Sequence, residues 1–167
     1  MFQIPPECEE FFHEVELGVV IGRTCKDVTE DGVMEHVGGY ALCLDMAAMD
    51  IQRKAKSKGH PWSVAKGFDT ACPVGDFIPK EKIPDTSNVL LWLTVGGELK
   101  QKSLTSDMIF TVPHVLSYLS RYFTLERGDL VLTGSPAGAG PVSRGQTIEA
   151  GLDVSGETLA SFTFPVE

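Results

Sequence analysis

Three acidic side chains stand where the sequence otherwise reads as protein core: Glu14 and Glu16 in HEVELGVVIG, and Asp45 at the end of YALCLD. On a β-strand, residues i and i+2 point to the same face, so Glu14 and Glu16 should project side by side. Carboxylates brought together cost free energy unless a cation lies between them. Three of them would make a site for a hard cation such as Mg²⁺, with coordination positions open for a substrate.

An E-x-E pair also occurs commonly on the solvated face of an edge strand, and this alternative requires no metal. The flanking residues favour the metal site. His13 precedes the pair, and LGVVIG follows it without a residue typical of an exposed face.

Two further segments could contribute to chemistry. Lys66 lies among small and apolar residues in SVAKGFDT, where it could be a pocket cation for a carboxylate or an oxyanion; a surface lysine is the alternative. SPAGAGP (135–141) lacks the Lys-Ser/Thr of a P-loop, so we expect a rigid loop that brings Ser135 or backbone N–H groups near a small ligand, or a plain turn. Neither G-x-S-x-G nor H-E-x-x-H is present.

Composition narrows the class of protein. The 167 residues, 43% hydrophobic and 22% charged, are enough for one domain with a sizeable core. A net charge of −9 argues against nucleic acid or an anionic membrane as a partner, and no apolar run is long enough to span a bilayer. The first twelve residues, MFQIPPECEEFF, have the pattern of neither a signal nor a transit peptide. Four cysteines without a C-x-x-C spacing fit reduced intracellular thiols.

The elements that must position these residues can be predicted from periodicity and turn residues. In the first part of the chain we expect a strand over 14–21, a weak short helix in TEDGVMEHV, and a strand over 40–44 after a turn at Gly38-Gly39. A helix over 46–58 should follow, stopped by Gly59.

The second part begins with a hairpin over 89–103 that turns at Gly96-Gly97, followed by a helix over 112–123 with Thr111 as its N-cap. A strand in ERGDLVLTG and two strands around Ser155-Gly156 complete the chain. Strands outnumber helices and do not alternate with them, which predicts an α+β fold with mostly antiparallel sheet.

Several motifs in fixed order resemble the fumarylacetoacetate hydrolase family, and within it the acylpyruvate hydrolase and oxaloacetate decarboxylase branch. The resemblance implies a mixed β-roll with a few short helices, a homodimer, and a catalytic domain over 13–167 behind a divergent extension over 1–12. The motifs that carry it are HEVELGVVIG (13–22), VGGYALCLDM (37–46), PWSVAKGFDTACPVGDFIPKEKIPD (61–85), TSDMIFTVPHVLSYLS (105–120) and GDLVLTGSPAGAGPV (128–142).

The resemblance also implies roles. Glu14, Glu16 and Asp45 would be ligands of Mg²⁺ or Mn²⁺, and Lys66 would be the active-site lysine. Gln52 would line the substrate site, and Ser135 stands where the family has the threonine of a G-T-P loop. The implied activity is cleavage of a C–C bond in a small 2-oxo acid, by acylpyruvate hydrolysis or oxaloacetate decarboxylation, through a metal-bound enolate. The expected location is the cytoplasm, with the mitochondrial matrix as the alternative from kinship.

Two departures from the family pattern leave other functions open. The family's N-terminal GRNY-like strand and its lid with a His–Glu pair have no counterpart in this sequence. The family's D-x-T-x-R-D-x-Q reads here from Asp45 to Gln52 with Met49 at the arginine position, so a bidentate clamp for the substrate carboxylate is missing. One alternative is a weakly active or non-catalytic metal-binding paralogue or isoform that acts by binding or dimerisation. Another is an isomerase or hydratase acting on 2-oxo acids.

Overall fold

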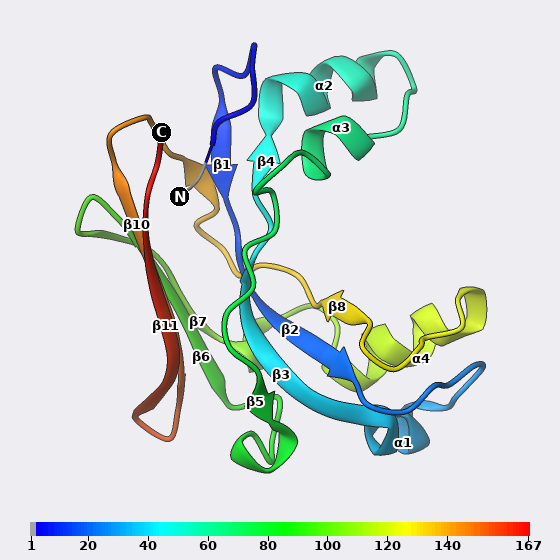
Figure 1. The fold of residues 1–167 in the computed structure, drawn as a ribbon. Helices are drawn as coiled ribbons and strands as arrows, with labels where there is room; N and C mark the ends of the chain where they lie inside the picture. The colour runs from blue at the N-terminus through cyan, green and yellow to red at the C-terminus, as the bar shows by residue number, and fades with distance from the viewer. Residues whose placement is uncertain (1–2) are drawn as a thin grey trace.

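Three antiparallel sheets form the frame of the protein in a computed structural model that describes residues 3–167 (Figure 1). One of the two four-stranded sheets has the strand order β11-β10-β6-β7, and both of its hairpins, β6-β7 and β10-β11, are joined by two-residue turns. Its strands are β6 (Val89–Val95), β7 (Glu98–Leu104), β10 (Thr147–Val154) and β11 (Glu157–Pro165).

The second sheet, of order β5-β3-β2-β8, lies against the first and shares its core. Alternate residues of β6 are buried, whereas β2 and most of β3 are buried on both faces because they lie in the middle of the molecule. The strands are β2 (Val15–Ile21), β3 (Val37–Leu44), β5 (Ile78–Pro79) and β8 (Leu130–Leu132). A small third sheet joins β1 (Phe11–His13) to β4 (Ala47–Ala48) and β9 (Gly140–Pro141).

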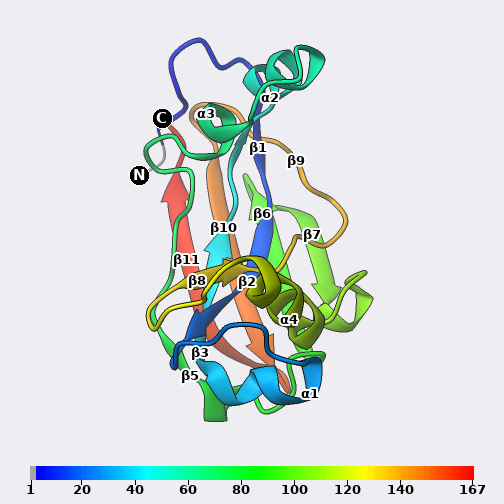
Figure 2. The same cartoon turned by 90° about the vertical axis from the view of Figure 1, so that its right-hand side faces the viewer.

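The helices are short and gather at two ends of the sheets (Figures 1 and 2). At one end lie α2 (Met49–Ser57) and α3 (Ser63–Lys66). At the other end lie α1 (Glu30–Val33), which continues as a 3₁₀ turn at Met34–His36, and α4 (Val112–Tyr122). Further 3₁₀ turns occur at Lys80–Lys82 and Thr105–Asp107. No helix within residues 3–167 is long and apolar enough to cross a membrane.

These observations confirm the predicted α+β class with mostly antiparallel strands. The glycine turn of the first hairpin has φ of 58° at Gly96 and 81° at Gly97. In α4, the Thr111 hydroxyl accepts a hydrogen bond from the backbone N–H of His114 at 3.3 Å, as an N-cap should. Cys43, in β3, is fully buried as a small apolar residue, and the cysteines are free thiols.

Two local predictions were wrong. The expected helix over 46–58 begins only at Met49, because Ala47 and Ala48 pair with the backbone of β1 as strand β4. Gly38 and Gly39 do not form a turn either, since β3 already starts at Val37. A Cβ added to Gly38 would lie 2.9 Å from the Cα of Gly22, so glycine is needed there to let two backbone segments approach closely.

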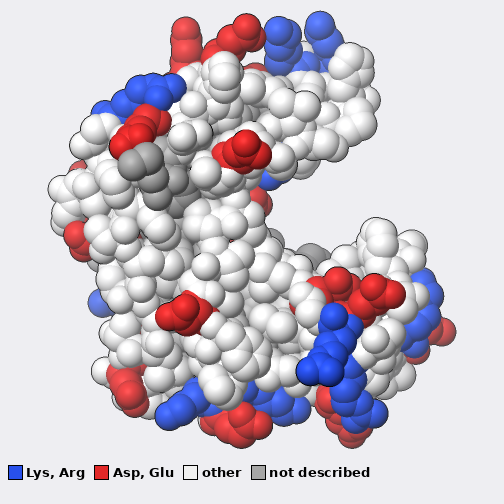
Figure 3. Space-filling view, in the orientation of Figure 1, with Lys and Arg blue, Asp and Glu red and all other residues white. Residues whose placement is uncertain are grey.

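The two helical ends stand apart, and the space-filling view shows an open notch between them (Figure 3). The chain crosses the inner wall of this notch twice, from β1 into β2 and from β3 into β4 (Figure 1). The predicted acidic residues lie at these two crossings.

Candidate metal centre

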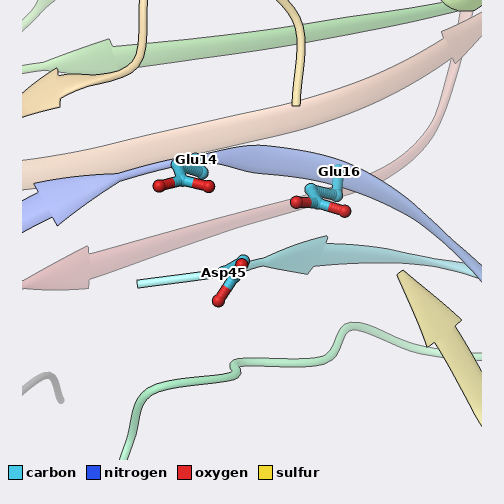
Figure 4. A group of neighbouring side chains, drawn as sticks. All are labelled: Glu14, Glu16 and Asp45. Carbon is cyan, nitrogen blue, oxygen red and sulfur yellow. The ribbon is translucent and has the colours of Figure 1, made fainter. Parts of the chain in front are cut away.

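Glu14, Glu16 and Asp45 converge, each offering a carboxylate oxygen that lies within 4.8 Å of the others (Figure 4). Antiparallel pairing of β2 with β3 places Val15 opposite Leu44, which brings Asp45 next to Glu14. The backbone N–H of Asp45 donates to the carbonyl of Glu14 at 2.9 Å and fixes this register at the site itself. Glu14 occupies the link between β1 and β2 rather than a strand interior, but the expected side-by-side arrangement with Glu16 holds.

Glu16 is the most enclosed of the three, with 4% of its surface exposed. Burial raises its pKa to about 7, and the negative charges of Asp45 and Glu14 add to this, while a hydrogen bond from the Gly134 N–H at 2.6 Å and the charge of Lys66 oppose it. A carboxylate with this pKa is only partly ionised at neutral pH unless a cation joins it.

Lys66, at the end of α3, lies beside the carboxylates. Its Nζ is 2.8 Å from Asp45 Oδ2 and 3.2 Å from Glu14 Oε1. Burial acts to lower the pKa of this lysine, but the hydrogen bond to Asp45 and the two carboxylate charges outweigh burial and raise the pKa. The side chain is 25% exposed and paired with two carboxylates, so Lys66 is not a free surface lysine.

The cluster fits a divalent cation. With all groups ionised, the three carboxylates and one ammonium leave two negative charges in a partly buried place, which is unfavourable without a counter-ion. An all-oxygen donor set of this kind is the one that Mg²⁺ and Mn²⁺ prefer.

The SPAGAGP loop approaches the cluster from β8. Gly134 donates its N–H to Glu16, and the Ser135 hydroxyl donates to the carbonyl of Val15 at 2.9 Å. A cavity of about 350 Å³ adjoins the loop and is lined by residues 107–110 and 133–137. The start of the loop therefore contacts Glu16 through a backbone N–H and Val15 through Ser135, and the loop lines the adjoining cavity. Its role toward a ligand remains a prediction.

Gln101, in β7, is a residue that the sequence reasoning missed. It is 1% exposed, and its side chain contacts His13, Val15, Ser135 and Pro136 through hydrogen bonds of 2.8–3.1 Å. Burial lowers the pKa of the neighbouring His13, so the ring is neutral at pH 7. The sequence carried no clear signal for it, because burial does not alternate along β7: Leu99, two residues before Gln101, is exposed.

Met49 and Gln52 lie on α2, the helix that packs against α3 and β4 at one edge of the notch. Both are half-buried, and in residues 3–167 neither side chain makes a hydrogen bond or ion pair with the carboxylates. The backbone N–H of Met49 instead donates to the carbonyl of Glu10 at 2.8 Å. Their roles in substrate binding remain predictions.

The fold is a β-roll with a cluster of three carboxylates that could hold a metal ion, and the sequence matches a family model over nearly its whole length. The fumarylacetoacetate (FAA) hydrolase C-terminal family model covers residues 1–166. The chain therefore belongs to the fumarylacetoacetate hydrolase family, as its motifs indicated.

Individual relatives are also similar over nearly the whole chain. The human protein named oxaloacetate tautomerase FAHD1, mitochondrial, is 52% identical over 164 residues, which is 98% of this chain and 72% of that protein. Oxaloacetate decarboxylase, mitochondrial, of Dictyostelium discoideum is 52% identical over 150 residues, 90% of this chain and 69% of that protein. The crystal structure of fumarylpyruvate hydrolase from Pseudomonas aeruginosa in complex with Mn²⁺ and pyruvate superposes with a TM-score of 0.92 at 34% identity, covering 99% of this chain and 69% of that one.

Proposed function

We propose that this protein is a divalent-metal-dependent enzyme that cleaves a C–C bond in small 2-oxo acids through enolate chemistry, with oxaloacetate decarboxylation as its leading reaction. The observation that carries this proposal is the convergence of Glu14, Glu16 and Asp45 on one point with Lys66 beside them. The relatives named for oxaloacetate chemistry, and the Mn²⁺ and pyruvate in the Pseudomonas structure, support the same class of reaction.

Glu14, Glu16 and Asp45 would hold the cation, for which we propose Mg²⁺ or Mn²⁺. When bound, such a cation polarises the 2-oxo group of the substrate and lowers the energy of the enolate that forms as the bond breaks. The chain's own contribution is to hold three carboxylates in one place before the ion arrives, which avoids their reorganisation during binding.

Lys66 would stabilise negative charge on the substrate. Its raised pKa keeps the side chain protonated at neutral pH, so it serves as a cation and a hydrogen-bond donor and not as a base. Once the carboxylates have another counter-ion, the ammonium is free to turn to the substrate. Loss of carbon dioxide leaves an electron pair that spreads onto the 2-oxo oxygen, and a donor near that oxygen stabilises the developing charge.

The Ser135 hydroxyl has a hydrogen-bond acceptor position available for the substrate. Its hydroxyl donates to Val15 and accepts from Gln101, and a hydroxyl has one proton and two acceptor positions. One acceptor position is therefore left. We propose that Ser135 orients its loop and offers this position to a substrate or water hydrogen, while Gln52 and Met49 face the substrate from α2.

A second candidate function is keto–enol tautomerisation of oxaloacetate. The name of the human relative favours it, and the enolate is common to both reactions. The two differ in whether a C–C bond breaks. Acylpyruvate hydrolysis is a further possibility within the same chemistry, and it additionally requires an activated water.

One assay series separates these functions. The purified protein is incubated with Mg²⁺ or Mn²⁺ and oxaloacetate, and pyruvate formation and decay of the enol absorbance are followed in parallel; acetylpyruvate replaces oxaloacetate in a second series. Decarboxylation predicts metal-dependent pyruvate release, and tautomerisation predicts enol decay without it. Absence of all three activities, with metal bound, would support the non-catalytic alternative.

We propose that the protein forms a homodimer, as the family resemblance implies. Exposed aromatic side chains along α4 support a contact with a second copy: the tilted rings of Tyr118 and Tyr122 have centroids 5.3 Å apart, and Tyr122 is 65% exposed. Light scattering after gel filtration would give the mass, and Tyr122→Lys should lower it if this face is the interface.

We also propose a mitochondrial location, because the relatives at about 50% identity carry that location in their names. This reverses the order of the two locations considered from the sequence. Fractionation of cells that express the tagged full-length protein would test it.

A further inference from the structure

The Gln101 side chain lies under the peptide that joins two of the candidate metal ligands. Its Oε1 accepts hydrogen bonds from the N–H of Val15 at 3.1 Å and from Nδ1 of His13 at 2.9 Å. Its Nε2 donates to the Ser135 hydroxyl at 2.8 Å and to the Pro136 carbonyl at 2.9 Å. A carboxamide has two donor and two acceptor positions, and all four are used.

The chemistry of the partners fixes which way the amide faces. A backbone N–H can only donate and a proline carbonyl can only accept, so the oxygen must face Val15 and the nitrogen must face Pro136. The same logic places a proton on Nδ1 of His13, since the oxygen that it meets cannot donate. The side chain therefore has one arrangement, not two.

These bonds close a ring around the residue between Glu14 and Glu16. Val15 donates to Gln101, Gln101 donates to Ser135, and the Ser135 hydroxyl donates to the carbonyl of Val15 at 2.9 Å. Next to Ser135 along the chain, the Gly134 N–H donates to Glu16 itself. The buried amide of Gln101 thus connects the Glu14–Glu16 segment to the 134–136 loop, which contacts Glu16.

We propose that Gln101 is a positioning residue for the metal centre: it holds the Glu14–Val15–Glu16 backbone and the 134–136 loop in the register that lets the carboxylates converge. The proposal rests on the proposed function, because it assigns Gln101 a task only if these carboxylates bind a cation. Partners that orient metal ligands typically contribute about 10–100-fold to metal affinity.

A purely structural role is the alternative, since a buried amide with four hydrogen bonds also stabilises the fold. The two roles differ in what they change. A structural role lowers the unfolding temperature and leaves the metal affinity of the folded protein unchanged. A positioning role weakens metal affinity in protein that is still folded.

The test measures the dissociation constant of Mn²⁺ by electron paramagnetic resonance, and the unfolding temperature of the metal-free protein, for the parent, four single variants and one double variant. Gln101→Met keeps the length of the side chain and removes all four bonds, and Ser135→Ala breaks the ring at another point. Ser135→Thr keeps the hydroxyl. Ser120→Ala is the matched control: it removes a buried hydroxyl that bonds Val28 and Ser117 at the remote α1–α4 end.

We expect Gln101→Met to weaken Mn²⁺ binding by about 10–100-fold. Ser135→Ala should show a smaller loss, and Ser135→Thr should restore the parent value. Ser120→Ala should lower the unfolding temperature without changing Mn²⁺ affinity. Combining Gln101→Met with Ser135→Ala should lose little more than Gln101→Met alone, because both break one ring.

Mn²⁺ affinity within twofold of the parent in folded Gln101→Met would overturn the positioning role and leave the proposed function standing. If Gln101→Met does not fold, unchanged affinity in Ser135→Ala would overturn it equally. A parent protein that binds no Mn²⁺ would overturn the metal-dependent function and the positioning role together.

Discussion

The inner wall of the notch and its rim at helix α2 differ in how firmly their side chains are held. On the inner wall, Glu16 lies in β2, while Glu14 and Asp45 directly adjoin β2 and β3. Both strands are buried and paired on both edges, and Gln101 ties β2 to the 134–136 loop. On the rim, Met49 and Gln52 are carried by α2, a nine-residue helix in which no residue is fully buried. The inner wall keeps the residues that the family resemblance implies, whereas the rim carries Met49 in place of the expected arginine.

The difference indicates where this fold can change its chemistry. Shifting a carboxylate on the inner wall would disturb strand register and several buried hydrogen bonds at once. Few substitutions should therefore be tolerated on the inner wall. A half-exposed side chain on α2 can be replaced with little effect on the core. We infer that the inner wall sets the reaction class, while the rim adjusts substrate preference.

The largest effect should come from breaking the inner wall directly. Asp45→Asn removes one of three charges and leaves a neutral amide, so Mn²⁺ affinity should fall by more than the ~100-fold that losing a ligand's hydrogen-bond partner can cost. Isothermal titration calorimetry would measure it. Asp153→Asn, a half-buried acid that bonds Trp92 far from the site, is the control. Equal Mn²⁺ affinity in the two variants would rule out Asp45 as a ligand.

Lys66→Met should separate chemistry from metal binding. Turnover of oxaloacetate should fall about 100–1,000-fold, the range seen when a preorganised donor to a developing anion is removed. Mn²⁺ affinity should stay equal or rise, because the lysine competes for Glu14 and Asp45. Lys80→Met, which removes a lysine bonded to the Met34 carbonyl, should leave both unchanged. Full turnover in Lys66→Met would exclude the role given to this residue.

The raised pKa of Glu16 predicts a pH dependence of stability in the metal-free protein. The folded state keeps the Glu16 proton up to a pKa of about 7, whereas the pKa of an unperturbed glutamate is 4.5, so the stabilisation is complete below pH 4.5 and is lost as pH rises through 7. The full loss is of the order of 3 kcal/mol, because each pKa unit corresponds to about 1.4 kcal/mol. Thermal unfolding in a chelator between pH 5 and pH 8 should therefore show a steeper decline for the parent than for Glu16→Gln.

Glu16→Gln isolates the contribution of the Glu16 proton, because the amide oxygen can still accept the Gly134 N–H. Other titrating groups, including His13, are common to both proteins. Parallel stability profiles of parent and variant would contradict the shifted pKa. Adding Mn²⁺ at pH 8 should restore stability to the parent and not to Glu16→Gln.

The smallest effect is expected at the rim. Met49→Arg should tighten binding of oxalate, a mimic of the pyruvate enolate, by about tenfold, since a charge-assisted hydrogen bond contributes about 1.5–3 kcal/mol. The gain should shrink with added salt. Met49→Lys, with a charge but no planar fork, should gain less. Unchanged oxalate affinity in a folded Met49→Arg protein would show that this position does not face the substrate.

The sequence was sufficient to predict features that depend on neighbours along the chain. The E-x-E pair, the Gly96-Gly97 hairpin and the Thr111 N-cap rest on local periodicity and turn chemistry, and the structure has them. It could not show that Ala47 and Ala48 join a sheet, because their partner strand lies some thirty-six residues away at Phe11 and Phe12. Gln101 was missed for the same reason: its four partners come from two distant segments, and a single glutamine has no spacing to read.

Gly38, far from the carboxylates, has a consequence for interpreting variants of this gene product. It faces Gly22 across the irregular pairing at the end of β2 and β3, with no space for a side chain on either residue. Any larger residue there must push apart the same two strands that bring Asp45 next to Glu14 at their other end. A missense change at Gly38 should therefore be classed with active-site lesions, although it would look like a remote loop substitution on a linear map of the protein.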